Sequence, residues 1–256
     1  MTAVDVGDRA RYLLPAMGRR VESALSLISE AATRGRLGVS VSTGKDSLVV
    51  LDLVRRVIPD APAGYYDSGT ETEYNWNREF CKRYDVEIVT SEIPLADLCR
   101  DYGYWGHEAD KYHAEVNWFA FLVGEPAFRF IERHDLGVTA LGLRAQESGG
   151  RRMNRHKKGL LYTVDTVPGR PNYTHVTPIA DWSHDDVWAY IAGRKLWYNP
   201  AYDLMADAGI PRNEWRVSVL LGSSASNIGR YARLRQIAPE KFAALAAHFP
   251  DIRRFT

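Results

Sequence analysis

Residues 37–58, LGVSVSTGKDSLVVLDLVRRVI, decide the fold of this 256-residue chain. The run 37–42 is short, apolar and β-branched, which predicts a buried strand. Residues 47–58 place apolar side chains at a helical period, and Pro59 ends that helix. The turn between them is Ser42-Thr43-Gly44-Lys45-Asp46-Ser47. A strand that feeds a helix through such a turn aims backbone N–H groups and the positive end of the helix dipole at one point. The stretch therefore predicts an anion site, and phosphate is the usual anion.

The turn does not fit the Walker A loop, G-x-x-x-x-G-K-[ST]. Asp46 stands where that loop needs Ser or Thr, and Val39 stands where it needs its first glycine. The turn resembles instead the SGGxDS pyrophosphate loop of the PP-loop family, with Thr43 in place of one glycine. In that family the nucleotide is cut between its α and β phosphates, and pyrophosphate leaves or an adenylyl group is transferred. The alternative is an ordinary strand–helix turn, which the motifs further along the chain disfavour.

The composition is that of a soluble globular protein, with 45% hydrophobic and 25% charged residues. The net charge is +1, so binding to nucleic acid would need a local basic patch. The sequence shows neither an apolar run near the length of a membrane helix nor a secretory signal. Cys81 and Cys99 make no disulfide framework and no metal cluster, and both are expected to be buried as small hydrophobic residues. We therefore expect a reduced, cytoplasmic protein with no membrane partner.

The rest of the chain alternates between strand and helix signals. Strands are predicted at 63–67, 86–90 and 138–141, and a hairpin at 160–164 with 173–176. Helices are predicted at 8–32, 70–84, 94–100 and 118–134, the last interrupted near Pro126. Ser183, followed by two acids, is expected to cap a further helix. We expect a nucleotide-binding α/β domain at 1–210 and a helical, partly basic extension at 211–256.

Asp67 ends the strand predicted at 63–67, at the edge where ligands bind in open parallel sheets. Residues 65–73, YYDSGTETE, resemble the DTG-x-x-x-x-E stretch of the phosphoadenosine-phosphosulfate reductase branch of the PP-loop family. Glu71 and Glu73 are explained by the first turn of a helix, whose dipole favours acids. For Asp67 two interpretations stay open, a helix cap or a contact with nucleotide or metal.

A second strong motif follows the strand predicted at 138–141. Residues 142–152, GLRAQESGGRR, meet every fixed position of the G-x-R-x-x-E-S-x-x-R motif of the same branch, at Gly142, Arg144, Glu147, Ser148 and Arg151. Guanidinium groups bind phosphate oxygens in a bidentate way and stay charged at any useful pH. Charge that builds on a leaving pyrophosphate needs such partners. Glu147 is expected to orient an arginine rather than to act in catalysis.

Two further blocks strengthen the resemblance. Residues 178–191, PIADWSHDDVWAYI, and 198–203, YNPAYD, resemble conserved blocks of the same family. The resemblance therefore covers about residues 38–203, through four separated blocks in family order. It implies a Rossmann-like adenine nucleotide α-hydrolase fold, an α/β fold with a twisted parallel sheet of about five strands and helices on both faces. Nucleotide would lie across the C-terminal ends of the strands.

The departures from the family pattern bear on the reaction. Sulfonucleotide reductases use a cysteine near the C-terminus in an E-C-G-L-H motif, and this chain has no cysteine after Cys99. The cysteine pairs that bind an iron–sulfur cluster in one subclass are missing too. We therefore expect no sulfonucleotide reduction, no iron–sulfur cluster and no zinc.

The resemblance then implies an ATP pyrophosphatase, closest in type to the component of bacterial DNA phosphorothioation systems. Mg²⁺-ATP binds, an acceptor oxygen attacks the α-phosphate, and pyrophosphate leaves. The adenylated acceptor would then receive sulfur from a cysteine desulfurase. By this resemblance Asp46 holds Mg²⁺, and Lys45, Arg144 and Arg151 stabilise charge on the phosphates. The residues implied to cradle pyrophosphate are Ser42, Thr43, Gly44 and Ser47, and those implied to bind nucleotide from the other motifs are Asp67, Gly142, Glu147 and Ser148.

The acceptor is expected to be a nucleic acid, because residues 144–158 carry six Arg or Lys residues against one acid, Glu147. Three alternatives stay open. They are adenylyl transfer to a small acceptor such as flavin mononucleotide (FMN), a sulfonucleotide reductase-like protein without its catalytic cysteine, and a regulatory subunit that binds nucleotide without turnover. Association into a homodimer is also left open.

Overall fold

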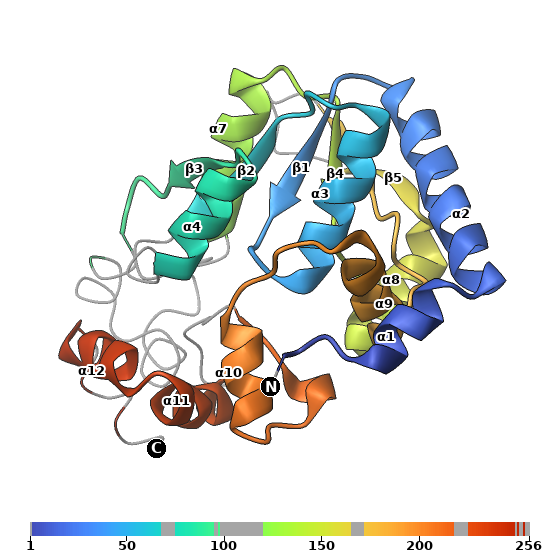
Figure 1. Cartoon of the computed structure of the whole chain (residues 1–256). Helices are drawn as coiled ribbons and strands as arrows, with labels where there is room; N and C mark the ends of the chain where they lie inside the picture. Colours follow the sequence, from blue (N-terminus) through green and yellow to red (C-terminus); the bar gives the residue numbers. More distant parts are fainter. Residues whose placement is uncertain are drawn as a thin grey trace.

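The computed structural model describes residues 2–67, 75–94, 97, 120–164, 172–217, 225–248, 250 and 253. Within these residues a six-stranded sheet has the order β3-β2-β1-β4-β6-β5 (Figure 1). The strands are β1 (Leu37–Val41), β2 (Ala63–Asp67), β3 (Glu87–Thr90), β4 (Val138–Leu141), β5 (Leu161–Val164) and β6 (Tyr173–Val176). All pair in parallel except β5, which is antiparallel to β6. The expected parallel sheet of five strands is confirmed, and the predicted hairpin adds an antiparallel edge strand.

The strand order reverses between β1 and β4. The chain moves from β1 through β2 to β3 in one direction, and from β4 to β6 in the other. In the centre, Val39 of β1 pairs with Ala63 of β2 and with Ala140 of β4. Connections that leave two adjacent strands in opposite directions open a crevice at the carboxyl ends of those strands, which is where open α/β sheets bind ligands. The turn at 42–47 follows β1 and the loop at 142–148 follows β4, so both border this point.

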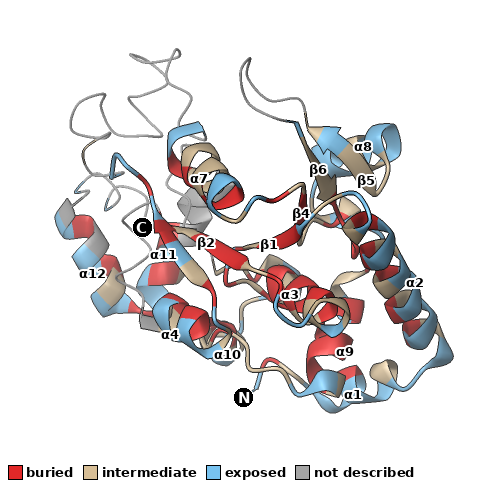
Figure 2. Cartoon of the chain, turned by 90° about the horizontal axis from the view of Figure 1, so that it is seen from above, coloured by how far each residue is buried: buried red, intermediate tan, exposed pale blue. Residues whose placement is uncertain are grey.

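Helices cover both faces of the sheet (Figure 2). On one face lie α3 (Lys45–Val57) and α4 (Asn75–Arg83), and on the other lies α7 (Glu125–Arg133). The inner side of α3 is apolar, and its Leu48, Leu51 and Val54 are buried in the main core. On the opposite face Phe130 of α7 is fully buried and contacts β2 at Gly64.

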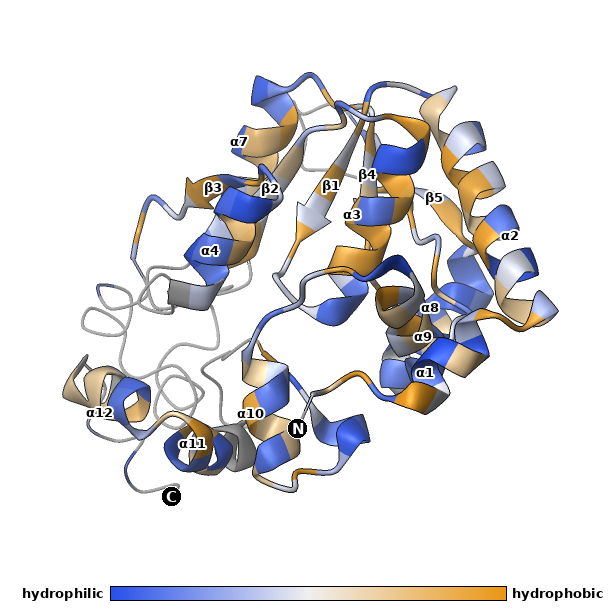
Figure 3. Ribbon diagram, viewed as in Figure 1, coloured by the Kyte–Doolittle hydropathy of each residue, from blue (hydrophilic) through white to orange (hydrophobic). Residues whose placement is uncertain are grey.

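The N-terminal helix differs from its prediction. The expected single helix at 8–32 is two helices, α1 (Val6–Tyr12) and α2 (Pro15–Ala32). The break lies at Leu14, which is extended with φ −70° and ψ 140°. A proline disfavours the helical conformation in the residue before it, whereas Pro15 itself fits the first position of a helix. Figure 3 shows that α2 then combines hydrophobic and hydrophilic residues along its length, as expected of a helix packed on one side.

Other element boundaries shift by a few residues. The helix after the phosphate-loop turn begins at Lys45 rather than at residue 47, because Gly44 is its N-cap. The interruption expected near Pro126 is a change from a π-helical turn, Ala120–Gly124, to α7. Of the helix predicted at 70–84, residues 70–74 lie outside the described residues, as does all but residues 94 and 97 of the one predicted at 94–100.

The second half of the chain is mainly helical. It contains α8 (Gly149–Lys158), α9 (His184–Arg194), α10 (Ala201–Asp207), the 3-10 turn η3 (Arg212–Glu214), α11 (Ala225–Ile237) and α12 (Pro239–His248). Ser183 caps α9 by accepting the N–H of Asp186, as predicted. Trp188 of α9 is fully buried and packs edge-on against Tyr202 and Trp215, which joins α9 and α10 to the segment that follows them. No helix in the described ranges is long and apolar enough to cross a bilayer.

The end of β4 makes a close backbone contact that only glycine permits. A Cβ on Gly142 would lie 2.7 Å from the carbonyl carbon of Asp46 and from the nitrogen of Ser47. Gly142→Ala should therefore destabilise the fold by about 1–3 kcal/mol, the usual cost of overpacking. Thermal unfolding measures this. Gly150→Ala is the control, because its Cβ would have only the Ser148 hydroxyl near it, at 3.9 Å. Equal melting temperatures for the two variants would show that the close contact at Gly142 does not affect the stability of the fold.

Candidate functional site

The turn after β1 is organised by the hydroxyl of Ser47. This oxygen accepts the N–H of Ser42 at 3.1 Å and donates to the carbonyl of Gly44 at 3.0 Å. The N–H of Lys45, at the start of α3, is bound by the phenol oxygen of Tyr202 at 3.0 Å. Ser42 is exposed, whereas Lys45 and Ser47 are buried. The turn is thus held from within and from α10, with its exposed side at the crevice between β1 and β4.

Thr43 adopts a conformation that is uncommon for its residue type. Its φ of 56° lies in the left-handed region, which β-branched residues rarely enter. Its side chain is buried, and its hydroxyl donates to Oδ1 of Asn77 in α4 at 2.8 Å. The same oxygen accepts from Nδ2 of Asn199 at 3.2 Å. This buried network holds a backbone geometry that costs on the order of 1–3 kcal/mol, and glycine would adopt the same geometry without that cost.

Asp46 lies between two buried cations. Its carboxylate contacts Nζ of Lys45 at 2.5 Å and Nε of Arg144 at 2.5 Å. The side chains of Lys45 and Arg144 are only 2% and 3% exposed. Burial acts to raise the pKa of Asp46, but the charges of Lys45 and Arg144 outweigh it, so the pKa lies below its ordinary value. Burial lowers the pKa of Lys45 to about 8, against the attraction of Asp46.

The loop after β4 supplies Arg144 and holds it in place. Because Gly142 lies against the first turn of α3, Arg144 reaches Asp46 from 98 positions away in the chain. Glu147 accepts the backbone N–H of Arg144 at 3.1 Å and forms an ion pair with Arg151. Ser148 caps α8 and accepts the N–H of Arg151 at 3.1 Å. Glu147 therefore orients two arginines, as the sequence predicted, and the Ser148 hydroxyl is used by the helix.

The structure places Asp67 apart from this cluster, one strand away at the end of β2. The side chain is buried, and its carbonyl accepts the N–H of Ser91 at 2.9 Å. Burial, followed by the negative charge of Asp67, raises the pKa of Cys81 in α4 to about 12. A buried thiol with a raised pKa is unreactive. Cys99 lies outside the described residues.

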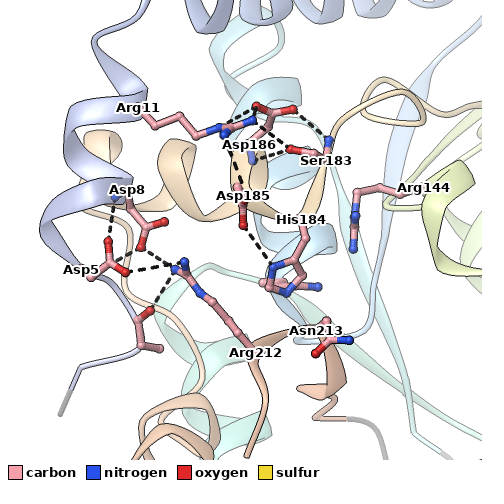
Figure 4. A network of polar contacts seen from close by, with 12 residues as sticks. Asp5, Asp8, Arg11, Arg144, Ser183, His184, Asp185, Asp186, Arg212 and Asn213 are labelled. Carbon is pink, nitrogen blue, oxygen red and sulfur yellow. Dashed lines mark hydrogen bonds and ion pairs between the residues drawn. The ribbon is translucent and has the colours of Figure 1, made fainter.

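Sequence reasoning did not assign three residues near this cluster. Tyr202 binds the start of α3, and its signal was present in the YNPAYD block. Arg216 has no motif around it, yet its charge contributes to the lowered pKa of Lys45. His184, the first residue of α9, lies near Arg144 and Arg212 (Figure 4), and the charge of Lys45 also acts on it. Burial and then these cations lower the pKa of His184 to about 4, so its ring is neutral near pH 7.

The donor set fits a magnesium ion that arrives with phosphates. Mg²⁺ is usually held by one or two carboxylates while phosphate oxygens and water complete its shell. Asp46 is ionised and partly exposed, so it suits that role. Within the described residues, no group of three or more His, Cys, Asp or Glu side chains is placed to hold a metal alone.

Comparison with known proteins identifies the family of the chain. Residues 36–233 match the phosphoadenosine phosphosulfate reductase domain. The chain belongs to this family. It is 30% identical over 190 residues to a phosphoadenosine 5'-phosphosulfate reductase of Synechococcus sp., which covers 71% of this chain and 76% of that protein. It is 28% identical to the enzyme of Xanthomonas axonopodis, over 64% of this chain and 65% of the relative.

A solved structure shows the same fold. Candida glabrata FMN adenylyltransferase aligns with a TM-score of 0.51 at 16% identity, over 77% of this chain and 65% of that protein. As a family member with this fold, the chain carries the mostly parallel, Rossmann-like sheet that the sequence predicted.

Lys45 should lower the stability of the folded protein at neutral pH, because its burial outweighs its attraction to Asp46. Lys45→Met should raise the free energy of unfolding by about 1–3 kcal/mol at pH 7, because the neutral side chain removes the cost of burying the charge and Arg144 still pairs with Asp46. The folded pKa of about 8 lies below the ordinary 10.5, so wild-type stability should rise between these pH values. The advantage of Lys45→Met should shrink over the same range.

Chemical denaturation at pH 7 and pH 10 measures both effects. Lys82→Met is the control, because Lys82 is exposed on α4 and should change stability by less than about 0.5 kcal/mol. A Lys45→Met variant less stable than wild type at pH 7 would mean that the pairing with Asp46 dominates.

Proposed function

We propose that the protein is an ATP pyrophosphatase that adenylates an acceptor for sulfur incorporation, and that the acceptor is an oxygen of a nucleic-acid backbone. The observation that carries this proposal is the convergence of Lys45 and Arg144 on Asp46 at the turn between β1 and α3. Two buried cations beside a helix N-terminus form a site for phosphates, and a carboxylate among them suits the accompanying Mg²⁺.

The proposed reaction breaks the bond between the α-phosphorus and the oxygen that bridges to the β-phosphate. The acceptor oxygen attacks the α-phosphorus, and the leaving pyrophosphate takes the bonding electron pair. Lys45, Arg144 and Arg151 then stabilise the charge that builds on the pyrophosphate. The turn at 42–47 and the start of α3 bind the β and γ phosphates through backbone N–H groups. Bound Mg²⁺, held by Asp46, would neutralise part of the phosphate charge and orient the phosphates.

Adenylyl transfer fits this chain better than the reduction that its relatives carry out. The sequence has two cysteines, Cys81 and Cys99, and none in its last 157 positions. Cys81 is buried with a raised pKa, which makes it a poor nucleophile and a poor carrier of sulfur. Sulfur would therefore come from a partner, and a cysteine desulfurase is the partner that we propose.

Helix α8 supports a nucleic-acid acceptor. Its sequence, GGRRMNRHKK, contains no acid, and most of its residues are exposed. Arg155 pairs with Asp181, whereas Arg152 and Lys157 form no ion pair with any described residue. Arg144 and Arg151 line a small pocket together with Arg155 and Tyr162, which links the charge centre to α8. Exposed cations that continue from a phosphate site suit the neutralisation of phosphates along a nucleic-acid backbone.

The products of ATP turnover test the reaction. Incubated with Mg²⁺-ATP, duplex DNA and a cysteine desulfurase, the protein should release AMP and pyrophosphate. Lys45→Ala should reduce this release by about 10²-fold or more, because it removes one stabilising cation. The control is Lys82→Ala on the exposed side of α4. ADP and phosphate as products would refute the proposal. FAD formed from added FMN would favour the small-acceptor alternative, and ATP binding without cleavage would favour a regulatory subunit.

The salt dependence of binding tests the acceptor. For a 20-base-pair duplex, the slope of log K against log [salt] reports the number of phosphates neutralised, at about 0.9 per contact. The double variant Arg152→Gln/Lys157→Gln should lower that slope by about 2 and weaken binding equally for unrelated sequences. Arg9→Gln/Arg19→Gln, with both positions exposed on α1 and α2, is the charge-matched control. Equal slopes for the two double variants would exclude α8 as the binding surface.

A further inference from the structure

The segment 211–217, which links α10 to the C-terminal helices, is fixed at two points. Arg212 pairs with the buried Asp8 of α1, and its guanidinium also donates to the carbonyl of Ala3 at 3.0 Å (Figure 4). Trp215 is buried in the aromatic cluster around Trp188, and its indole N–H donates to the carbonyl of Ile210 at 2.8 Å. The path of the chain between these anchors is therefore set by the fold.

This path brings the segment against the phosphate-loop turn. A Cβ built on Gly44 would lie 3.5 Å from Cγ2 of Val217 and 3.5 Å from the phenol oxygen of Tyr202. Tyr202 also accepts the N–H of Lys45. Val217 and Tyr202 thus border the turn at Gly44 and Lys45, and Arg216 lies between Val217 and the anchored Trp215.

Arg216 differs from the other cations of the site in its partners. Lys45 and Arg144 share Asp46, and Arg151 pairs with Glu147. Nη1 of Arg216 donates to two main-chain carbonyls, those of Asn213 at 3.3 Å and Trp215 at 2.7 Å. Across the described ranges, no carboxylate forms an ion pair with Arg216.

The charge of Arg216 acts on other cations of the site. It contributes to lowering the pKa of Lys45 and of Arg151, after the larger effect of burial on each. The group contains four cations, Lys45, Arg144, Arg151 and Arg216, and two carboxylates, Asp46 and Glu147. Four cations against two carboxylates leave an excess of two positive charges, which suits a polyphosphate.

We propose that Arg216 binds the β and γ phosphates of ATP, and the pyrophosphate that leaves, as a fourth cation supplied by the segment after α10. This assignment rests on the proposed function of the turn at 42–47. Val217, next to Arg216, borders the end of the turn that contains Gly44 and Lys45, and the proposed function places the β and γ phosphates, not adenosine, at that end. It can exchange carbonyl oxygens for phosphate oxygens without leaving a carboxylate unpaired, whereas Lys45 and Arg144 must first release Asp46.

Ligand selectivity separates this role from a purely structural one. If Arg216 only stabilised the turn at 213–215, its removal would lower the affinity of the site for every ligand by the same factor. If Arg216 contacts the β and γ phosphates, its removal lowers the affinity for pyrophosphate. The affinity for AMP, which lacks those groups, stays unchanged. The lysine variant keeps the charge but loses the bidentate fork, so it should give an intermediate result.

The experiment is calorimetric titration of the full chain with Mg²⁺-pyrophosphate and, separately, with AMP. Relative to wild type, Arg216→Gln should bind pyrophosphate at least about tenfold more weakly, as expected for one lost charge-assisted hydrogen bond. Its affinity for AMP should stay within about twofold, because no contact to AMP is removed. Arg216→Lys should fall between Arg216→Gln and wild type. Arg34→Gln is the charge-matched control, because Arg34 is exposed before β1 and pairs with Glu30.

The outcomes that would overturn the assignment are distinct from those that would overturn the proposed function. If wild type binds pyrophosphate and Arg216→Gln binds it equally well, Arg216 is not a phosphate ligand. The same conclusion follows if Arg216→Gln loses affinity for AMP and pyrophosphate to the same extent. If wild type binds neither Mg²⁺-ATP nor pyrophosphate, the proposed function fails, and the role of Arg216 fails with it.

Discussion

The backbone contact between Gly142 and the first turn of α3 is the constraint on which the site depends. It brings the loop after β4 so close to the start of α3 that a single added carbon would meet backbone atoms at 2.7 Å. Arg144, two residues further along, can therefore reach Asp46 across the reversal in strand order. Without this approach the two strand ends would carry separate polar loops, and Arg144 would not meet Asp46.

The turn at 42–47 and the start of α3 combine several features that do not stabilise the fold. Thr43 takes a left-handed conformation against its β-branched preference, and Lys45 is buried at a pKa of about 8. Buried ion pairs add little to stability once desolvation is counted, so the pairs on Asp46 are poor evidence for a structural role. Strained backbone and shifted pKa values that cluster at one strand end are typical of functional sites. Asn77 and Tyr202 hold this arrangement from the neighbouring helices by accepting hydrogen bonds from Thr43 and Lys45.

Most of the fold could be predicted from local sequence patterns. The strands at 37–41, 63–67 and 138–141 are β-branched or apolar runs, and the cap at Ser183 is a short-range signal. The α1–α2 break was missed because the apolar period continues across it, and only the local effect of Pro15 decides it. In the site, motifs located the turn at 42–47 and the loop at 142–148. They could not locate Arg216, because its position depends on long-range packing of Trp215 and Val217. No motif surrounds Arg216 in the sequence, so local patterns offered no signal for it.

The carboxylate of Asp46 occupies the place between Lys45 and Arg144 that a phosphate oxygen would also favour. Any ligand that enters must therefore compete with an anion that the chain itself provides. A neutral molecule gains no electrostatic free energy by displacing the carboxylate. A singly charged anion only replaces one negative charge with another. The exchange is favourable only for a group with several negative charges, or for one that brings a metal ion to bind the displaced carboxylate. Under the proposed function, this internal counter-ion would act as an electrostatic filter against weakly charged metabolites.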